Sequence, residues 1–224
     1  MACTCNDSAM DLDPSSLSPS DCYKILIGAI VPRPIAFVST RSAAGQDNLA
    51  PFSFFAGVGS NPMTVLFCPA NTPHGTEKDT LRNAKPVAEG GTGEFVINVV
   101  PASLGAKMAL CAEPLPFGES EFDLANLHTS PSLKVAPHRV LESPLSLECT
   151  TVQVIRTNPG QPAGGNIVIG RVVHIHAHDE VMNERYHVDP AKLDAVGRMA
   201  GEAYCYTRDR FNMKMGRSKP ADSR

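Results

Sequence analysis

Strand-like sequence begins at Pro34-Ile35-Ala36-Phe37-Val38-Ser39-Thr40, where β-branched and aromatic residues are concentrated. Comparable segments, each next to a Gly or Pro turn or alternating in polarity, are residues 48–56, 64–68, 94–100, 145–156, 166–178 and 199–206. Short helices fit only at residues 21–27, 79–85 and 104–112. At least six strands with such short helices between them do not form an alternating βαβ sheet. The pattern predicts a mainly β fold, a mostly antiparallel barrel.

Composition excludes several classes of protein. The chain has 224 residues, 42% hydrophobic and 19% charged, which is enough to bury the core of one domain. A formal charge of −3 supplies no basic field, so we expect no nucleic-acid binding. The longest apolar run, residues 25–31, is far shorter than the roughly 20 residues of a membrane span. Seven cysteines, an odd number, and an N-terminus without a signal-peptide pattern predict a cytoplasmic protein with no membrane anchor.

The ends of the chain differ from its middle. Residues 1–20 are rich in serine and lack an apolar period, which predicts a flexible N-terminal arm. Ser20-Asp21 is expected to cap a helix that runs through Ile27, with Ile25 and Leu26 facing inward. The main domain is expected over residues 21–210, and residues 211–224 read as a basic C-terminal tail.

Several catalytic and nucleotide-binding motifs are missing. The sequence has no GxxxxGK[ST], HExxH, GxSxG or paired CxxC pattern. Gly57-Val58-Gly59 begins like a dinucleotide-binding loop, but Pro62 follows where a helix would have to start. No nucleophile with a base and an orienting group is legible, so the catalytic residues are left unknown.

Three histidines, His174, His176 and His178, alternate along residues 166–178 and therefore share one face of a strand. Two interpretations stand. Neighbouring rings are close enough in such a strand to approach a common metal ion. The opposite face is apolar, however, which is also typical of an ordinary strand with its polar side in water; we assign no metal site.

Two other segments combine groups that suit a phosphorylated heterocycle. Residues 48–62 place small hydroxyls and amides beside three phenylalanines, with prolines that leave backbone groups unpaired. The alternative is a core strand with a proline-marked bulge. Lys78-Asp79-Thr80 supplies a cation and a hydroxyl for a phosphate, or simply a helix cap with a solvated lysine.

A series of blocks in one order resembles the flavin reductase-like family, the FMN-binding split barrels related to flavoredoxin. The resemblance covers about residues 21–210. Its blocks are residues 31–40 (VPRPIAFVST), 48–55 (NLAPFSFF), 60–62 (SNP), 78–83 (KDTLRN), 93–98 (GEFVIN), 120–125 (SEFDLA), 142–144 with 147–149, and 201–204 (GEAY). The chain departs from the family pattern at residues 56–59, at Met63 and in the glycine-rich residues 89–93.

The resemblance implies a six-stranded antiparallel split barrel with a Greek-key core and a homodimer with one FMN per subunit. It implies an FMN-dependent oxidoreductase with NADH or NADPH as transient co-substrate, with or without a monooxygenase partner. Alternatives are an FMN enzyme that transforms its own small-molecule substrate and a non-catalytic flavin-binding dimer. Proton donors for a bound substrate would come from Tyr204, Tyr206, His128 or His138.

The resemblance also implies the cofactor-binding residues. Arg33 would lie near the flavin rim, and Lys78, Asp79 and Thr80 at the phosphate. Phe54 and Phe55 would wall the ring or fill the barrel. The remaining contacts to the ring and ribityl chain would come from Ser39, Thr40, Asn48, Leu49, Ala50, Pro51 and Ser53.

Overall fold

A computed structural model describes residues 9–116 and 119–213. Seven strands form one antiparallel sheet in the order β2-β1-β5-β8-β9-β4-β3. They are β1 (Ala36–Arg41), β2 (Asp47–Phe52), β3 (Phe55–Ser60), β4 (Met63–Phe67), β5 (Glu94–Asn98), β8 (Leu145–Arg156) and β9 (Asn166–Ala177). The predicted mainly β, antiparallel fold is confirmed.

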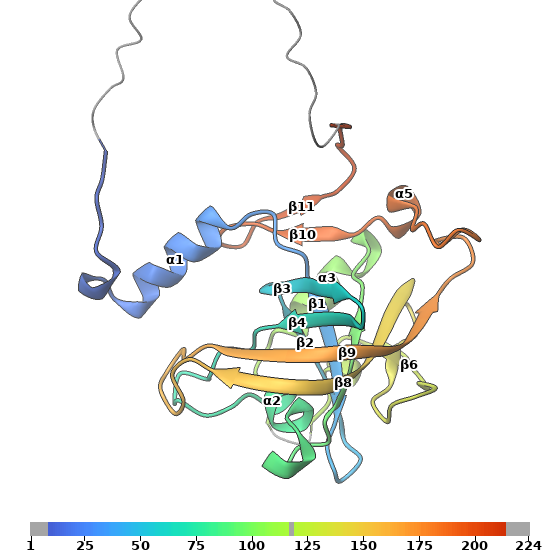
Figure 1. Cartoon of the computed structure of the whole chain (residues 1–224), viewed down its shortest axis with the longest axis horizontal. Helices are drawn as coiled ribbons and strands as arrows, with labels where there is room; N and C mark the ends of the chain where they lie inside the picture. The colour runs from blue at the N-terminus through green and yellow to red at the C-terminus, as the bar shows by residue number, and fades with distance from the viewer. Residues whose placement is uncertain (1–8, 117–118, 214–224) are drawn as a thin grey trace, which may run out of the picture.

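The sheet must close on itself because its two edge strands are joined by only two residues, Ser53 and Phe54. That connection spans about 10 Å. A flat sheet of seven strands would separate its edges by roughly 29 Å. The sheet therefore curls until β2 and β3 meet at this corner, which makes a barrel (Figure 1). Residues 48–56 were predicted as one strand, and the resemblance implied six strands in the barrel. The bend at Ser53 and Phe54 divides this segment into β2 and β3, so the sheet has seven.

Two hydrophobic clusters lie on opposite sides of the barrel wall. The inner one holds Phe52, Phe67 and Phe95, whose rings follow one another at centroid separations of 5.3 and 5.1 Å. Leu81 and Ala84 of α2 (Asp79–Ala84) belong to it, so this helix covers one end of the barrel. The outer cluster packs Phe37 and Leu49, from β1 and β2, against residues of α3 (Gly105–Leu110) and α4 (Glu121–Leu124).

The remaining elements are short. Two hairpins pair β6 (Thr129–Ser130) with β7 (Arg139–Val140) and β10 (Val196–Arg198) with β11 (Tyr204–Tyr206). The predicted strand over residues 199–206 is therefore wrong, since residues 199–203 form the turn of the second hairpin. Short helices complete the order: η1 (Pro14–Ser16), η2 (Val87–Glu89), η3 (Ala102–Leu104) and α5 (Pro190–Leu193). The helix expected over residues 104–112 is split into η3 and α3.

Helix α1 (Pro19–Ala29) extends away from the barrel beside the β10–β11 hairpin (Figure 1). It begins two residues earlier than expected, because the hydroxyl of Ser18, not Ser20, accepts the N–H of Asp21. Ile25 and Leu26 were expected to face inward, but each is 47% exposed. Residues 1–8 of the predicted arm and 214–224 of the predicted tail lie outside the described residues.

Candidate functional site

A groove of about 690 Å³ runs along β2. One wall is the loop that leads into α2, and the other is the segment after α3 together with the start of α4. The lining residues are Asn48, Ala50, Pro51, Phe52, Thr72, Pro73, His74, Thr76, Glu77, Lys78, Asp79, Thr80, Arg82, Cys111, Ala112, Glu113, Pro114, Leu115 and Glu121. Segments remote in sequence thus meet here because α2 and α4 both contact β2.

Six of the thirteen predicted site residues line this groove: Asn48, Ala50, Pro51, Lys78, Asp79 and Thr80. The Asn48 amide donates to the hydroxyls of Thr40, at 3.1 Å, and Thr80, at 3.0 Å. Both threonines are buried, and Asn83 donates to the same Thr40 hydroxyl. This packing fixes the Asn48 side chain, and no hydrogen bond among the described residues uses its amide oxygen. Thr40 therefore does not line the groove but positions Asn48, which does.

Lys78 is the cation of the groove that lacks a carboxylate. Its ammonium remains open to solvent, but surrounding protein atoms desolvate it enough to lower its pKa. The described residues place no ion-pair partner on it, and its recorded contact is the Phe52 ring, 5.9 Å from the nitrogen. The carboxylates on either side are engaged elsewhere: Asp79 pairs with Arg82, and Glu77 pairs with Lys85 and Arg156. Lys78 is thus positioned to receive an anion.

Three predicted residues gather at the β2–β3 corner, away from the groove lining. Arg33 is only 3% exposed and donates to the carbonyls of Ile27, Ile30 and Met199. Its Nε also donates to the hydroxyl of Ser53, and its guanidinium lies 5.7 Å from the Phe54 ring centre. The same arginine therefore ties α1, the β10–β11 hairpin and the corner of the barrel together.

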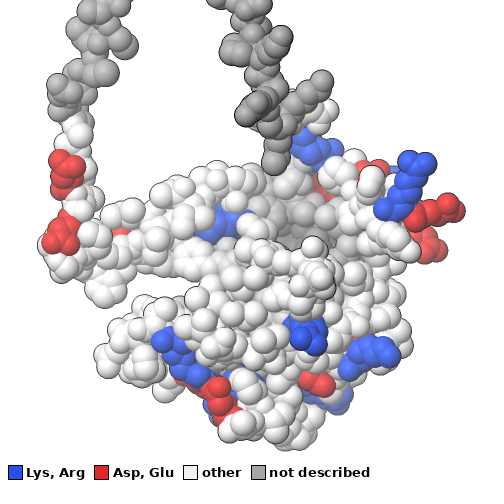
Figure 2. Space-filling view, in the orientation of Figure 1, with Lys and Arg blue, Asp and Glu red and all other residues white. Residues whose placement is uncertain are grey.

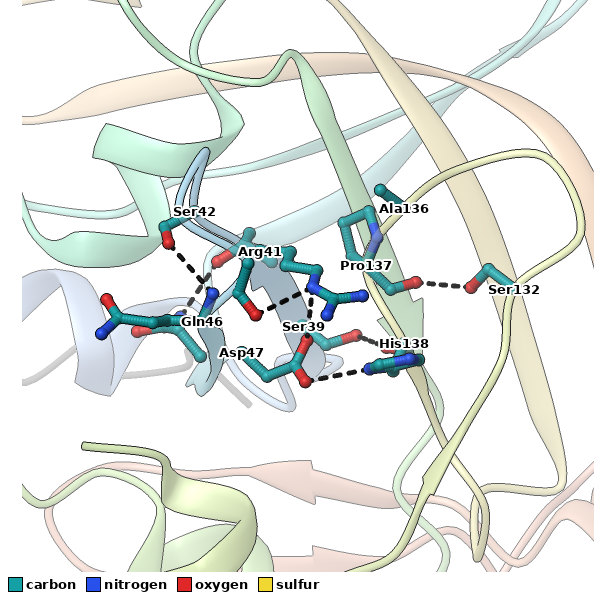
Figure 3. A network of polar contacts seen from close by, with 12 residues as sticks. Ser39, Arg41, Ser42, Gln46, Asp47, Ser132, Ala136, Pro137 and His138 are labelled. Carbon is teal, nitrogen blue, oxygen red and sulfur yellow. Dashed lines mark hydrogen bonds and ion pairs between the residues drawn. The ribbon is translucent and has the colours of Figure 1, made fainter. Parts of the chain in front are cut away.

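The other predicted residues face the protein interior. Leu49 and Phe55 pack against the outer and inner clusters respectively. Ser39 donates to the carbonyl of His138, whose ring bonds Asp47 at 2.9 Å, in a polar network near the turn of the β1–β2 hairpin (Figure 3).

The four suggested proton donors also lie off the groove lining. His128 pairs with Glu142 at 2.8 Å, as His138 does with Asp47. Tyr204 and Tyr206 stack under Arg198 and Arg208, each with 4.4 Å between the guanidinium carbon and the ring centre.

Sequence reasoning missed Glu121 and Cys111. Glu121 is 8% exposed, and its Oε2 accepts the backbone N–H of Leu49 at 2.8 Å. Burial, with a smaller contribution from Asp79, raises the pKa of this carboxyl against the opposing effect of backbone N–H groups. Burial and the neighbouring Glu121 raise the pKa of Cys111 to about 12, so its thiol stays protonated. Residues 120–125 were recognised as a family block, but nothing in the sequence signalled their contact with β2.

His174 and His176 of β9 lie close to His178, which directly follows the strand. The His176 and His178 rings are perpendicular, 6.1 Å apart. Burial, then Arg139 and the other two histidines, lower the pKa of His176. Across residues 9–116 and 119–213, no group of three or more His, Cys, Asp or Glu is arranged to hold a metal ion. Over the same ranges, no helix has both the length and the apolarity to cross a membrane.

The fold and groove define a split β-barrel with a binding site along one strand, and comparison with known proteins gives the family. The model of the flavin reductase-like domain matches residues 28–211. The chain belongs to that family. An uncharacterised protein of Halalkalibacterium halodurans is 38% identical over 206 residues, which are 91% of this chain and 95% of the relative. YwrF of Bacillus subtilis is 34% identical, over 88% of this chain and 94% of its own.

Solved structures agree with the family. Nitrilotriacetate monooxygenase component B from Bacillus cereus superposes with a TM-score of 0.84 at 30% identity, covering 92% of this chain and all of that one. The 2-nitrobenzoate 2-nitroreductase NbaA of Pseudomonas fluorescens gives 0.78 at 25% identity, covering 96% and 100%. Flavoredoxin of Desulfovibrio vulgaris, at 17% identity and a TM-score of 0.64 over 83% and 92% of the chains, shares the fold. These findings support a flavin-related oxidoreductase.

Proposed function

We propose that the groove binds FMN with its phosphate at Lys78, and that the protein is an FMN-dependent oxidoreductase with NADH or NADPH as hydride donor. The observation that carries the proposal is the Lys78 ammonium, which has no carboxylate partner within residues 9–116 and 119–213 although Glu77 and Asp79 adjoin it in sequence. A phosphate is the natural partner of such a cation. Bound FMN would supply the hydride-transfer chemistry.

The residues present fit a flavin mononucleotide. The volume of the groove, about 690 Å³, falls within the roughly 300–1,000 Å³ typical of cofactor sites. Asn48 offers an amide oxygen held by two buried threonines, which suits the orientation of a polar ligand edge. Ala50, Pro51 and Phe52 give the same strand an apolar surface for a flat ring. We also propose that Arg33, Ser53 and Phe54 contact the flavin at the corner of the barrel, as the resemblance implies.

A comparison of FMN with riboflavin separates the contribution of the phosphate to binding affinity from that of the ring. We expect Lys78→Ala to weaken FMN binding about tenfold to a hundredfold, the usual loss for a charge-assisted contact. Riboflavin, which has no phosphate, should bind the variant as it binds the unmodified protein. Quenching of flavin fluorescence measures both. Lys192→Ala, at an exposed lysine on α5, is the control. Equal FMN affinity in Lys78→Ala would show that the phosphate lies elsewhere.

The reduced nicotinamide donor and the acceptor are tested on the reconstituted protein. Anaerobic addition of NADH or NADPH should bleach the flavin absorption without any other substrate.

Nitrilotriacetate monooxygenase component B, a similar structure, supports a monooxygenase partner for this chain. The similarity to a 2-nitrobenzoate nitroreductase supports the alternative, an enzyme that reduces its own small-molecule substrate in the groove. Bleaching that requires a second substrate would favour this alternative.

We further propose a homodimer in the cytoplasm. Apolar side chains of α1 and β3 are exposed in the single chain, including Tyr23, Leu26 and Val58. The five described cysteines, Cys22, Cys68, Cys111, Cys149 and Cys205, are free thiols, which suits a reducing compartment.

A further inference from the structure

Glu121 is a buried carboxyl in the groove that no side chain neutralises. Its Oε2 accepts the N–H of Leu49, and its own backbone N–H also lies near the carboxyl. Among the described residues, no lysine, arginine, histidine or hydroxyl pairs with it. A carboxyl group has about four acceptor positions. This one therefore retains acceptor capacity on the groove side, where Glu121 contributes to the lining.

The contact with Leu49 changes what β2 offers to a ligand. The resemblance implied that Leu49 would contact the flavin, and a backbone N–H there would bind a flavin carbonyl. That N–H is already used by Glu121. The polar group next to this point of the strand is therefore a carboxyl, and an ionised carboxyl only accepts hydrogen bonds. When this carboxyl is ionised, the ligand atom that lies there must be a donor.

The positions of Lys78 and Glu121 along β2 indicate which donor. The Lys78 ammonium lies over Phe52, whereas Glu121 binds Leu49, three residues earlier. Those two positions are separated by about 10 Å of strand. The phosphate chain of FMN leaves the middle ring of the flavin, and the pyrimidine edge is one of the two ends of the ring system. With the phosphate at Lys78 and the pyrimidine edge turned along β2, that edge would face Glu121, and N3–H is the one N–H group of the oxidised ring.

We propose that Glu121 is a specificity-determining residue whose carboxylate accepts a hydrogen bond from flavin N3–H. The inference rests on the proposed function, because it needs FMN in this groove. The Leu49 N–H positions the carboxylate. A bound ligand without a donor at this point would exclude water from the carboxylate and give it no hydrogen bond in return, which makes binding of that ligand less favourable. A ligand with a methyl group in place of that hydrogen should be rejected.

The test compares FMN with 3-methyl-FMN on the full chain. The unmodified protein should bind FMN at least tenfold more tightly than 3-methyl-FMN, measured by fluorescence quenching. In Glu121→Ala this preference should fall to about twofold or less. Glu184→Ala removes an exposed carboxylate that lies outside the groove lining and should keep the preference. Glu121→Gln retains an oxygen for the Leu49 N–H, so it serves if Glu121→Ala does not fold.

A second measurement separates this contact from a merely structural role. A carboxylate beside the ring disfavours the addition of electrons to it. Glu121→Gln should therefore shift the midpoint potential of the bound flavin to a more positive value, whereas Glu184→Gln, outside the groove lining, should leave it unchanged. If the unmodified protein binds FMN and 3-methyl-FMN equally, or Glu121→Ala keeps the full preference, the assignment of Glu121 is overturned. If FMN does not bind at all, the proposed function itself fails.

Discussion

Arg33 shows how one buried side chain connects three parts of the molecule. Its guanidinium reaches three backbone carbonyls and the Ser53 hydroxyl, and no carboxylate of the described residues pairs with it. The carbonyls belong to the end of α1 and to the turn of the β10–β11 hairpin. Because Ser53 lies at the bend between β2 and β3, the arginine fixes the corner at which the barrel closes.

Replacement of Arg33 should therefore destabilise the fold. Arg33→Met keeps much of the side-chain volume but leaves buried carbonyls without a donor, so we expect a loss of about 3 kcal/mol in the free energy of unfolding. Urea denaturation followed by circular dichroism measures it. Arg185→Met, at an exposed arginine, is the control. A loss no greater than that of the control would contradict the role assigned to Arg33.

Glu77 predicts how stability depends on pH. Burial would raise the pKa of Glu77, but hydrogen bonds and charge from Lys85 and Arg156 outweigh it and hold the pKa below its ordinary value of 4.5. The carboxylate thus contributes stability above the unfolded pKa, and this contribution is lost as pH falls through the lower folded value. Glu77→Gln should cost about 1 to 2 kcal/mol at pH 7. The difference should shrink below pH 4.5 in denaturation curves; a difference independent of pH would refute the ion-pair explanation.

Among the elements, the long β8–β9 pair has a glycine that faces the buried Phe95 ring. A Cβ at Gly170 of β9 would collide with this ring, which comes from β5 and is fully buried. Two strands thus fit together only because one of them has no side chain there. We expect Gly170→Ala to cost about 1 to 3 kcal/mol through overpacking. Phe95→Leu should recover part of this loss in the double variant, and thermal unfolding of the four proteins gives the coupling. Additive losses would show that the ring is not the obstacle.

Elements with a strong local pattern could be predicted from the sequence, and elements set by tertiary contacts could not. β8 was predicted at its observed bounds because its residues have high strand propensity over their whole length. The bend at Ser53 escaped notice because barrel closure, not local sequence, imposes it. The groove was predicted only in part for the same reason. Lys78 was predicted from a family motif, whereas Glu121 reaches the groove through the packing of α4 on β2, which no motif signals.

At the scale of the whole molecule, the apolar face of α1 stays exposed in the part of the chain that the structure describes. All eleven of its residues are described, and none is buried. Tyr23, Leu26 and Ile30 lie on one face at helical spacing and are 55%, 47% and 51% exposed. The view in Figure 2 shows mostly uncharged surface over α1 and the neighbouring barrel. A short helix is not stable by itself in water, because its stability comes from packing of its apolar face. A second copy of the chain would supply that packing.

Dimerisation through this face gives a prediction of oligomeric state. The full chain should elute as a dimer in size-exclusion chromatography with light scattering at micromolar concentration. Leu26→Glu buries a charge in the expected interface and should produce a monomer or a far weaker dimer. Lys24 lies two residues before Leu26, so it faces the opposite side of the helix, and its side chain is 70% exposed. Lys24→Glu therefore introduces a carboxylate outside the expected interface and should leave the dimer intact. Dissociation by both substitutions would point to a general effect of charge, and a dimer that survives Leu26→Glu would place the interface on another face of the barrel.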